Sequence, residues 1–139
     1  MPPASVLNPA LPPYRILVAD DDPVVHEVTL YALQEFHYRG RAIEMVSAYS
    51  GAEAWETLQV QPDIVLVLLD VMMETTNAGL DLVPRIRGEL ERPSLRIVLR
   101  TGQPGDEPDH RLMERYDLDG YENKTQFTAE RLRATLTQA

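Results

Sequence analysis

The amino-acid sequence predicts a doubly wound α/β domain, in which helices cover both faces of a five-stranded parallel sheet. Apolar, strand-like runs alternate with helical segments along the whole chain from residue 14. Residues 64–69 are apolar without interruption, which is typical of a parallel strand covered on both faces. Two of the strand-like runs stop at aspartates, so the strand ends are also the expected location of function.

The composition indicates one soluble, cytoplasmic domain. The chain has 139 residues, 44% of them hydrophobic and 25% charged. A net charge of −9 argues against direct binding to nucleic acid or to an anionic membrane. The absence of cysteine excludes disulfides and thiolate catalysis. Residues 1–13 carry no charge and contain five prolines, so we expect a flexible proline-rich leader before a folded domain over residues 14–139.

The first strand, residues 16–19, ends at three aspartates, and a helix follows at once. Asp22 before Pro23 has the pattern of an N-cap with proline at the first helical position. We expect this helix to end near residues 37–40. Its predicted apolar stripe consists of Val24, Val25, Val28, Ala32, Leu33 and Phe36.

The remaining elements continue the alternation. Ser50 and Glu53 have the spacing of a capping box, and Pro84 is expected in the first turns of its helix, where proline is tolerated. The expected elements are a strand at 42–46, a helix from 50 to 58, a strand at 64–69, a helix at 80–90, a strand at 95–99, a helix at 109–116, a strand at 120–123 and a helix from 128.

Polar residues end four of the five strands: Asp20 with Asp21, then Asp70, Thr101 and Lys124. Parallel strands bring these positions to one edge of the sheet. Two carboxylates about 4 Å apart repel by about 4 kcal/mol at an effective dielectric constant near 20, so the cluster favours a cation. Mg²⁺ suits carboxylate ligands combined with a phosphate oxygen, and Mn²⁺ would substitute. Lys124 and the Thr101 hydroxyl suit negative charge developing on a phosphoryl group at Asp70.

The segments ILVADDDP, LLDVMM, VLRTG and DGYENK resemble the signature segments of the response-regulator receiver family, in the right order and spacing from Tyr14 to about Leu136. The resemblance implies a receiver domain over residues 14–139, with the flavodoxin-like strand order 2-1-3-4-5. It also implies the site roles: Asp20 and Asp21 as the metal pair, Asp70 as phosphoacceptor, Met72 as donor of a backbone carbonyl to the metal, Thr101 and Tyr121 as switch residues, and Lys124 as the conserved-type lysine.

The same resemblance implies the partners. A sensor histidine kinase, a phosphotransfer protein or a small phosphodonor would phosphorylate Asp70, and the domain would be a regulator rather than an enzyme acting on other molecules. The runs RIVLRTGQPG and YENKT resemble receivers that precede an HD-GYP-type cyclic-dinucleotide phosphodiesterase, which would be the downstream effector. Dimerisation remains open.

Four positions depart from the family pattern. Gly79 comes one residue later than usual, Glu74 replaces a common proline, and Thr125 follows Lys124 where proline is frequent. Arg100 is unusual in a covered strand, and we expect it either to escape at the strand end or to pair with a carboxylate such as Glu122. The histidines His26, His37 and His110 lack metal-ligand spacing and are expected to be surface or capping residues.

Two other functions remain open. Asp20 to Val24 also fits the D-x-D-x-[TV] pattern of haloacid-dehalogenase-like phosphatases, in which Asp20 would be the nucleophile. Alternatively, the chain is a degenerate receiver that only binds proteins, with Thr125 and the altered loop marking lost chemistry.

Overall fold

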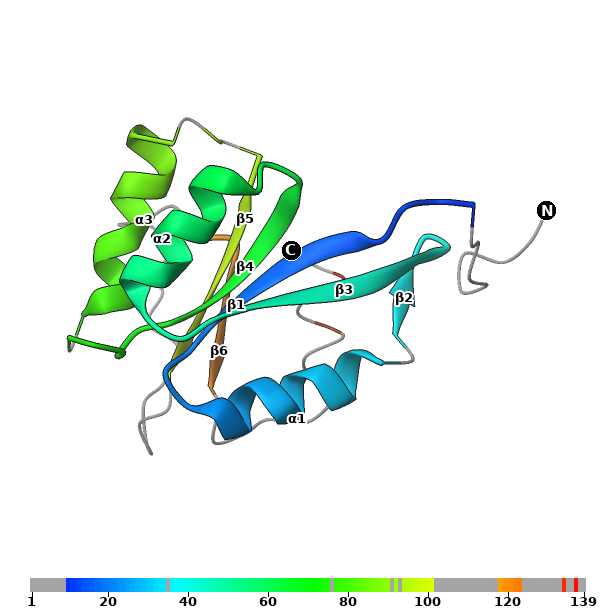
Figure 1. Cartoon of the computed structure of the whole chain (residues 1–139), viewed down its shortest axis with the longest axis horizontal. Helices are drawn as coiled ribbons and strands as arrows, with labels where there is room; N and C mark the ends of the chain where they lie inside the picture. Colours follow the sequence, from blue (N-terminus) through cyan, green and yellow to red (C-terminus); the bar gives the residue numbers. More distant parts are fainter. Residues whose placement is uncertain are drawn as a thin grey trace.

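The computed structural model describes residues 10–34, 36–75, 77–90, 92, 94–101, 118–123, 134 and 137. From β1 to β5, strands and helices alternate as predicted, apart from one added strand (Figure 1). In chain order the elements are β1 (Tyr14–Ala19), α1 (Pro23–Leu33), β2 (His37–Tyr38), β3 (Arg41–Ala48), α2 (Gly51–Val60), β4 (Ile64–Asp70), α3 (Ala78–Gly88), β5 (Arg96–Thr101) and β6 (Gly120–Asn123).

The sheet has the strand order β2-β3-β1-β4-β5-β6. The pairs of β1 with β3 and β4, of β4 with β5 and of β5 with β6 are all parallel. These five parallel strands therefore have the predicted order 2-1-3-4-5. Ala19 pairs with Leu69 and Asp70 with Arg100, so β1, β4 and β5 reach the same edge of the sheet together.

The short strand β2 was not predicted. The first helix was expected to end near residues 37–40, but it ends at Leu33, and His37 and Tyr38 pair antiparallel with β3. Arg39 and Gly40 form the two-residue connection, with φ angles of 52° and 79°. Positive φ at both positions is the requirement of a type I′ hairpin turn, and Gly40 meets it without steric cost. The hairpin therefore occupies residues that were expected to belong to the end of the helix.

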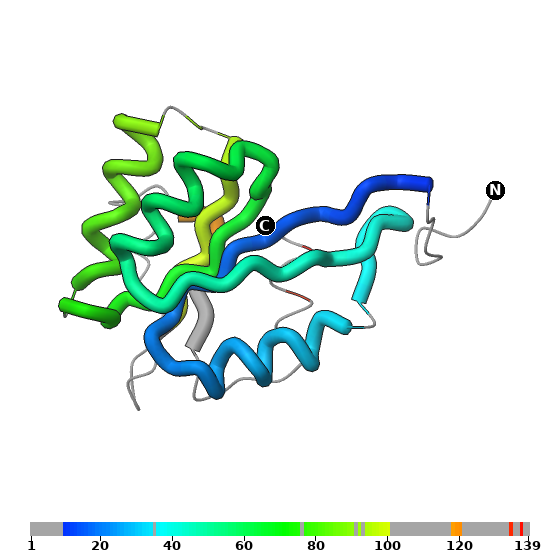
Figure 2. The backbone as a smooth tube through the Cα atoms, viewed as in Figure 1, coloured from blue at the N-terminus to red at the C-terminus, as the bar shows by residue number. Residues whose placement is uncertain are grey.

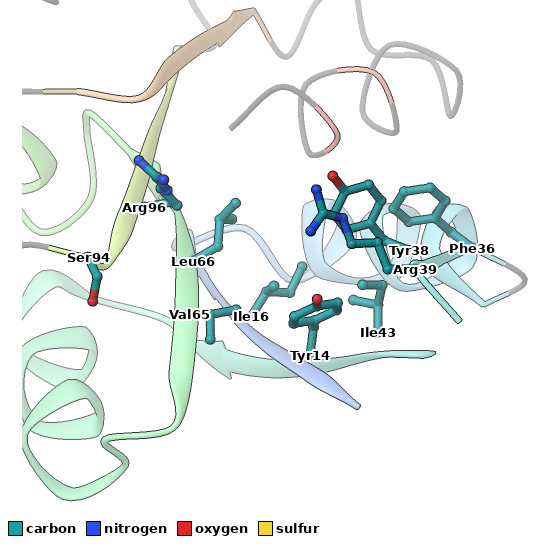
Figure 3. Close-up of a pocket in the computed structure, with 10 residues that line it drawn as sticks. All are labelled: Tyr14, Ile16, Phe36, Tyr38, Arg39, Ile43, Val65, Leu66, Ser94 and Arg96. Atoms are coloured by element: carbon teal, nitrogen blue, oxygen red, sulfur yellow. The ribbon is translucent and has the colours of Figure 1, made fainter. Parts of the chain in front are cut away.

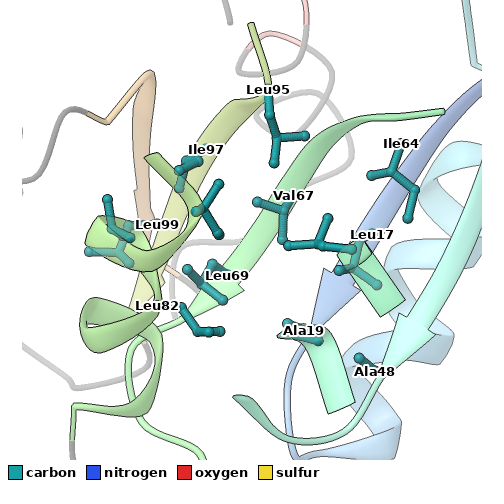
Figure 4. Packing of buried hydrophobic residues seen from close by; sticks show 14 of the residues in the cluster. Leu17, Ala19, Ala48, Ile64, Val67, Leu69, Leu82, Leu95, Ile97 and Leu99 are labelled. Atoms are coloured by element: carbon teal, nitrogen blue, oxygen red, sulfur yellow. The ribbon is translucent and has the colours of Figure 1, made fainter. Parts of the chain in front are cut away.

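Helices lie on both faces of the sheet, as predicted (Figures 1 and 2). On one face, α2 and α3 bury a cluster that includes Leu58, Leu82, Ile86 and the β4 residues Val67 and Leu69 (Figure 4). On the other face, Ala32 and Leu33 of α1 pack against a second cluster of residues from β1, β4 and β5, which are Ile16, Val18, Leu66, Leu68 and Val98.

The predicted apolar stripe of α1 is only partly correct. Ala32 and Leu33 are buried, but Val24 is 59% exposed and Val28 43% exposed. The face turned to the sheet instead carries His26 and Thr29, which are buried with Ala32 and Leu33. Both polar side chains hydrogen-bond to sheet residues, which satisfies them in a buried position. The helix is therefore rotated about its axis relative to the orientation that apolar periodicity predicts.

Helix α3 begins two residues earlier than predicted, at Ala78, which places Pro84 inside the helix rather than in its first turns. Proline has no N–H, so the helical bond to the carbonyl of Leu80 is not made. Burial of Leu82, Val83 and Ile86 against the sheet offsets this loss. Residues 78–88 therefore form a helix because of tertiary packing.

The later elements are described in part. The strand predicted at 120–123 is present as β6. Asp119, just before it, accepts hydrogen bonds from Arg87 of α3 and from the Ile97 amide of β5. The helix predicted at 109–116 lies outside the described residues, as does the leader up to residue 9. Of the last predicted helix, only Ala134 and Thr137 are described, both helical. Within the described parts of the chain, no helix is long and apolar enough to cross a membrane.

Candidate functional site

Three carboxylates meet at the carboxyl ends of β1 and β4. Asp70 is the last residue of β4, and Asp20 and Asp21 directly follow β1. One carboxylate oxygen from each residue lies within 4.8 Å of the other two. Asp20 and Asp70 are only 1% and 4% exposed, whereas Asp21 is open to solvent. The parallel register of neighbouring strands brings these residues together, as the sequence predicted.

The end of β1 is held by hydrogen bonds on two sides. The Asp20 amide donates to the Ala48 carbonyl at 3.1 Å, and the Asp22 amide donates to Asp20 Oδ1 at 2.9 Å. Asp22 itself is the N-cap of α1, because its Oδ1 accepts from the Val24 amide. The predicted capping role of Asp22 is therefore confirmed.

His26 is a buried part of this arrangement, so its predicted place at the surface was wrong. It is 4% exposed, and its Nε2 lies 2.8 Å from the Asp20 carbonyl oxygen. A carbonyl only accepts, so Nε2 carries a proton and donates. Nδ1 lies 2.9 Å from the Ser47 hydroxyl, and the ring is 4.3 Å from that of Tyr49. His26 thus ties the backbone of Asp20 to β3.

The loop after β4 is built against the backbone of Asp70. The Val71 amide donates to the Arg100 carbonyl at 3.0 Å, and the Gly79 amide donates to the Val71 carbonyl at 2.9 Å. A Cβ added at Gly79 would lie 1.9 Å from the Asp70 carbonyl oxygen, well inside van der Waals contact. Despite the extra residue in the loop, position 79 still requires glycine because the helix passes so close to β4.

Glu74, in the position where the family often has proline, reaches from this loop to α2. Its carboxylate accepts from the Gly51 amide at 2.7 Å and from the Ala52 amide at 3.0 Å. Partial burial raises the pKa of Glu74, but these two bonds and one from its own amide together outweigh that effect. The pKa of Glu74 therefore lies below its ordinary value.

Arg100 does not escape at the strand end. Its side chain is buried, 2% exposed, and Nη1 donates to the Thr29 hydroxyl of α1 at 3.2 Å. It therefore lies on the α1 face of the sheet and links β5 to that helix. The side chain of Glu122, the expected partner, is not among the described side chains.

The remaining predicted site residues are described less completely. Thr101 ends β5 one position beyond Arg100, at the same sheet edge as Asp70. Tyr121 lies in β6 and pairs with Leu99 of β5. Lys124, the residue after Asn123, lies outside the described residues. The side chains of Thr101 and Tyr121 are also not described. Met72 lies in the loop after Asp70 with a half-exposed side chain.

A separate cavity of about 360 Å³ lies at the opposite, amino end of the strands (Figure 3). Tyr14 and Arg96, the first residues of β1 and β5, are among its lining residues. Of the described site residues, neither the three aspartates nor Met72 lines it, so the carboxylate cluster and this cavity are distinct.

The donor set of the cluster fits a hard divalent cation. Three carboxylates supply only oxygen ligands, and two of them are almost completely buried. Buried like charges this close destabilise one another unless a cation or protons neutralise them. Mg²⁺ commonly binds through a few carboxylates and retains waters or phosphate oxygens in its other positions. Exposed Asp21 leaves one side of the cluster open for such ligands.

Sequence reasoning placed the three aspartates correctly but missed His26 and the bonds of Glu74. His26 lacks the spacing of a metal ligand. The only sequence signals for its burial are its position four residues after the N-cap Asp22 and its place on the same helix face as Thr29. Glu74 was recognised only as a departure from a family pattern. Its contact with α2 spans 22 and 23 residues, and no local signal predicts it.

Comparison with known proteins supports this description. The family model described as the response regulator receiver domain matches residues 16–137. The 3'3'-cGAMP-specific phosphodiesterase 2 of Vibrio cholerae is 44% identical over 124 residues, which are 89% of this chain and 24% of that protein. Chemotaxis protein CheY1 of Helicobacter pylori is 29% identical over 91 residues, 66% of this chain and 69% of that protein.

A crystal structure of a response regulator receiver protein from Pseudomonas putida has a TM-score of 0.72 and 26% identity, covering 91% of this chain and 98% of that one. A receiver domain protein from Methanospirillum hungatei has a TM-score of 0.69 at 19% identity, covering 90% and 91%, and shows the same fold. The family match includes the three aspartates of the acidic cluster and covers most of the chain. The chain therefore belongs to the response-regulator receiver domains of two-component signal transduction.

Proposed function

We propose that this receiver accepts a phosphoryl group on the Asp70 carboxylate and uses it to switch a downstream effector. The observation that carries the proposal is the meeting of Asp20, Asp21 and Asp70, whose oxygens lie within 4.8 Å of one another. Asp70 ends the central strand β4, and the backbone of the next residue, Val71, is held by hydrogen bonds to β5 and α3. A buried carboxylate at the end of an anchored strand, beside a cation site, suits nucleophilic attack on phosphorus.

In the proposed reaction, an Asp70 oxygen attacks the phosphorus of a phosphohistidine or of a small acyl phosphate. A new O–P bond forms while the donor's P–N or P–O bond breaks, and the leaving group keeps the electron pair. Thr101 and Lys124 would donate to the phosphoryl oxygens. Mg²⁺ or Mn²⁺, held by Asp20, Asp21, Asp70 and the Met72 carbonyl, would supply positive charge that offsets the carboxylates and the phosphoryl group. Water would later hydrolyse the acyl phosphate, so the chemistry is confined to the domain itself.

The output of the switch would lie on the β5–β6 side of the sheet. Phosphorylation would draw Thr101 and Lys124 inward, and Tyr121 of β6 would follow. Inverting a 1:99 population to 99:1 requires about 5.5 kcal/mol of differential interaction. A dianionic phosphoryl group bonded to a cation and a lysine is sufficient for an effect of that size.

The protein phosphodonor would be a sensor histidine kinase or a phosphotransfer protein, and a small phosphodonor would serve as well. A cyclic-dinucleotide phosphodiesterase of the HD-GYP type is the effector that the sequence resemblance favours. The 44% identity to a cGAMP-specific phosphodiesterase supports this link. This chain spans only 24% of that relative's length, so the effector would be a further segment of a longer protein or a separate partner.

The first test is intact-protein mass spectrometry after incubation with acetyl phosphate and Mg²⁺. We expect the wild type to gain one acid-stable, base-labile phosphoryl group and Asp70→Asn to gain none, because the amide cannot attack phosphorus. The matched control Asp63→Asn changes an exposed aspartate at the other end of β4 and should be phosphorylated like the wild type.

Two outcomes would contradict the proposal. If neither protein is modified although calorimetry shows that Mg²⁺ binds, the chain is a degenerate receiver that acts as a binding module. If the adduct forms on Asp20 instead, phosphatase-like chemistry is favoured. The N-cap role of Asp22 argues against that second case, because the second carboxylate of the D-x-D pattern already accepts from the first turn of α1.

A further inference from the structure

The first turn of α2 has an unusual set of hydrogen-bond partners. The first N–H groups of a helix have no partner within the helix and need acceptors from elsewhere. Here Ser50 Oγ accepts from the Glu53 amide at 3.0 Å, in the usual manner of an N-cap. The two preceding amides, of Gly51 and Ala52, instead donate to the two carboxylate oxygens of Glu74.

Glu74 belongs to the loop that follows the proposed phosphoacceptor. Other contacts of the described part of this loop include the bond from the Val71 amide to β5, the bond from the Gly79 amide back to the Val71 carbonyl, and the buried side chain of Met73. Met72, whose carbonyl is the predicted metal ligand, lies between the anchored residues 71 and 73 and two positions before Glu74. The loop is thus tied to β5 and α3 through its backbone and to α2 through the carboxylate of Glu74.

The contact is chemically strong and sterically specific. A carboxylate at a helix N-terminus interacts favourably with the helix dipole, and its hydrogen bonds are charge-assisted. Gly51 lets the carboxylate approach, because a Cβ at that position would lie only 3.2 Å from Glu74 Oε1. The Cβ of Ala78, at the start of α3, would lie 3.5 Å from the same added atom.

We propose that Glu74 is a positioning residue for the metal site. Its carboxylate accepts two hydrogen bonds from the first turn of α2 and so fixes the loop that presents the Met72 carbonyl beside Asp20, Asp21 and Asp70. This inference rests on the proposed function, since it assigns a role within the same site. Glu74 itself binds neither metal nor phosphoryl group. Proline, which is common at this position in the family, would fix the loop by restricting its backbone. Glu74 would fix the same loop through the hydrogen bonds of its carboxylate.

The test compares Mg²⁺ binding, by isothermal titration calorimetry, in the wild type and in Glu74→Gln. The amide keeps the size of the side chain but turns an NH₂ group toward one of the two N–H donors, which breaks the paired contact. Changes to groups that orient metal ligands typically weaken binding about 10- to 100-fold, and we expect a loss of about tenfold. The Mg²⁺ concentration that gives the half-maximal rate of phosphorylation by acetyl phosphate should rise by the same factor, while the rate at saturating Mg²⁺ is largely restored.

Two control variants separate positioning from simpler effects. Like Glu74→Gln, Glu53→Gln removes one negative charge near the first turn of α2, but it leaves the loop after β4 unchanged. It therefore measures the general electrostatic effect of losing a charge. Ser50→Ala removes one N-cap bond from α2, so it measures the stability of the helix end. Both should bind Mg²⁺ within about twofold of the wild type, because their changes leave the Glu74 contact in place. Gly51→Ala should weaken Mg²⁺ binding in the same direction as Glu74→Gln.

The possible failures are distinguishable. If the wild type neither binds Mg²⁺ nor gains a phosphoryl group, the proposed function fails and this inference fails with it. If the wild type does both and a folded Glu74→Gln binds Mg²⁺ equally well, only the role of Glu74 is refuted. An equal loss in Glu53→Gln or Ser50→Ala would also overturn it, in favour of a charge or helix-stability effect.

Discussion

At the residue scale, Gly79 shows how closely α3 approaches the site. A Cβ at this position would lie 1.9 Å from the carbonyl oxygen of Asp70 and 3.1 Å from the Cα of Val71. Both neighbours are backbone atoms at the end of the strand that carries the proposed phosphoacceptor, so neither can turn away as a side chain would. Adding one methyl group here must move either α3 or the end of β4.

We therefore expect Gly79→Ala to lower the free energy of unfolding by about 1–3 kcal/mol, the usual cost of overpacking, and to weaken Mg²⁺ binding as well. Gly88→Ala is the matched control, because the end of the same helix has open space around it. That variant should be neutral or more stable by up to about 1 kcal/mol. Urea denaturation measures the free energy of unfolding of both variants. Equal values would show that α3 can shift without cost.

At the element scale, Arg15 joins the three neighbouring strands β3, β1 and β4. Its guanidinium, on β1, donates to Glu44 of β3 at 3.2 Å and to Asp63, just before β4, at 2.9 Å. The hydrogen bond from Arg15 is the largest influence on Asp63 and holds the pKa of that carboxyl below its ordinary value, against a smaller effect of desolvation. The contact lies at the amino edge of the sheet, far along the strands from the acidic cluster.

This contact predicts a pH dependence whose sign follows from the lowered pKa. The stabilisation is present above the ordinary pKa of an aspartate and is lost as the pH falls through the lowered pKa of Asp63 in the folded protein. In an NMR titration of the side-chain carboxyl, Arg15→Gln should raise the midpoint for Asp63. Arg41→Gln, whose guanidinium lies over the ring of Tyr14, should leave that midpoint in place. The opposite result would mean that Arg15 does not pair with Asp63 in solution.

At the scale of the whole molecule, the sheet separates two hydrophobic clusters that share the strand β4. Leu69 faces α2 and α3, Leu68 faces the α1 side, and both are completely buried. Since alternate residues of one strand contribute to both clusters, neither layer can come apart without exposing the strand that ends at Asp70. The structure thus predicts a single cooperative unit.

We expect Leu68→Ala and Leu69→Ala each to lower the free energy of unfolding by about 2–5 kcal/mol, with one transition in each case. Val65→Ala, on the same strand but 41% exposed, should cost much less. Denaturation followed by far-ultraviolet circular dichroism and by Trp55 fluorescence provides the measurement. Separate transitions for the two probes would indicate that the layers unfold independently.

The sequence by itself determined most of the described elements and the meeting of three aspartates at one sheet edge. Alternating strand-like and helical segments predict the parallel sheet, because parallel strands need crossover connections, and the resemblance to receiver domains predicts the strand order. Strand ends predict where Asp20, Asp21 and Asp70 meet, since the carboxyl ends of parallel strands lie on one edge. The N-caps Asp22 and Ser50 were also recognisable, because capping depends on nearest neighbours along the chain.

Only the tertiary structure decided which partners polar residues take in distant segments of the chain. Helix α1 is rotated so that Val24 and Val28 face solvent, while the buried side chains of Thr29 and His26 hydrogen-bond to β5 and β3, and apolar spacing does not reveal this rotation. Glu74 meets α2 across more than twenty residues. Helix and strand signals are local and repeat with a fixed period, whereas hydrogen bonds between distant segments depend on where packing brings them, so the sequence predicts the former and the folded chain alone shows the latter.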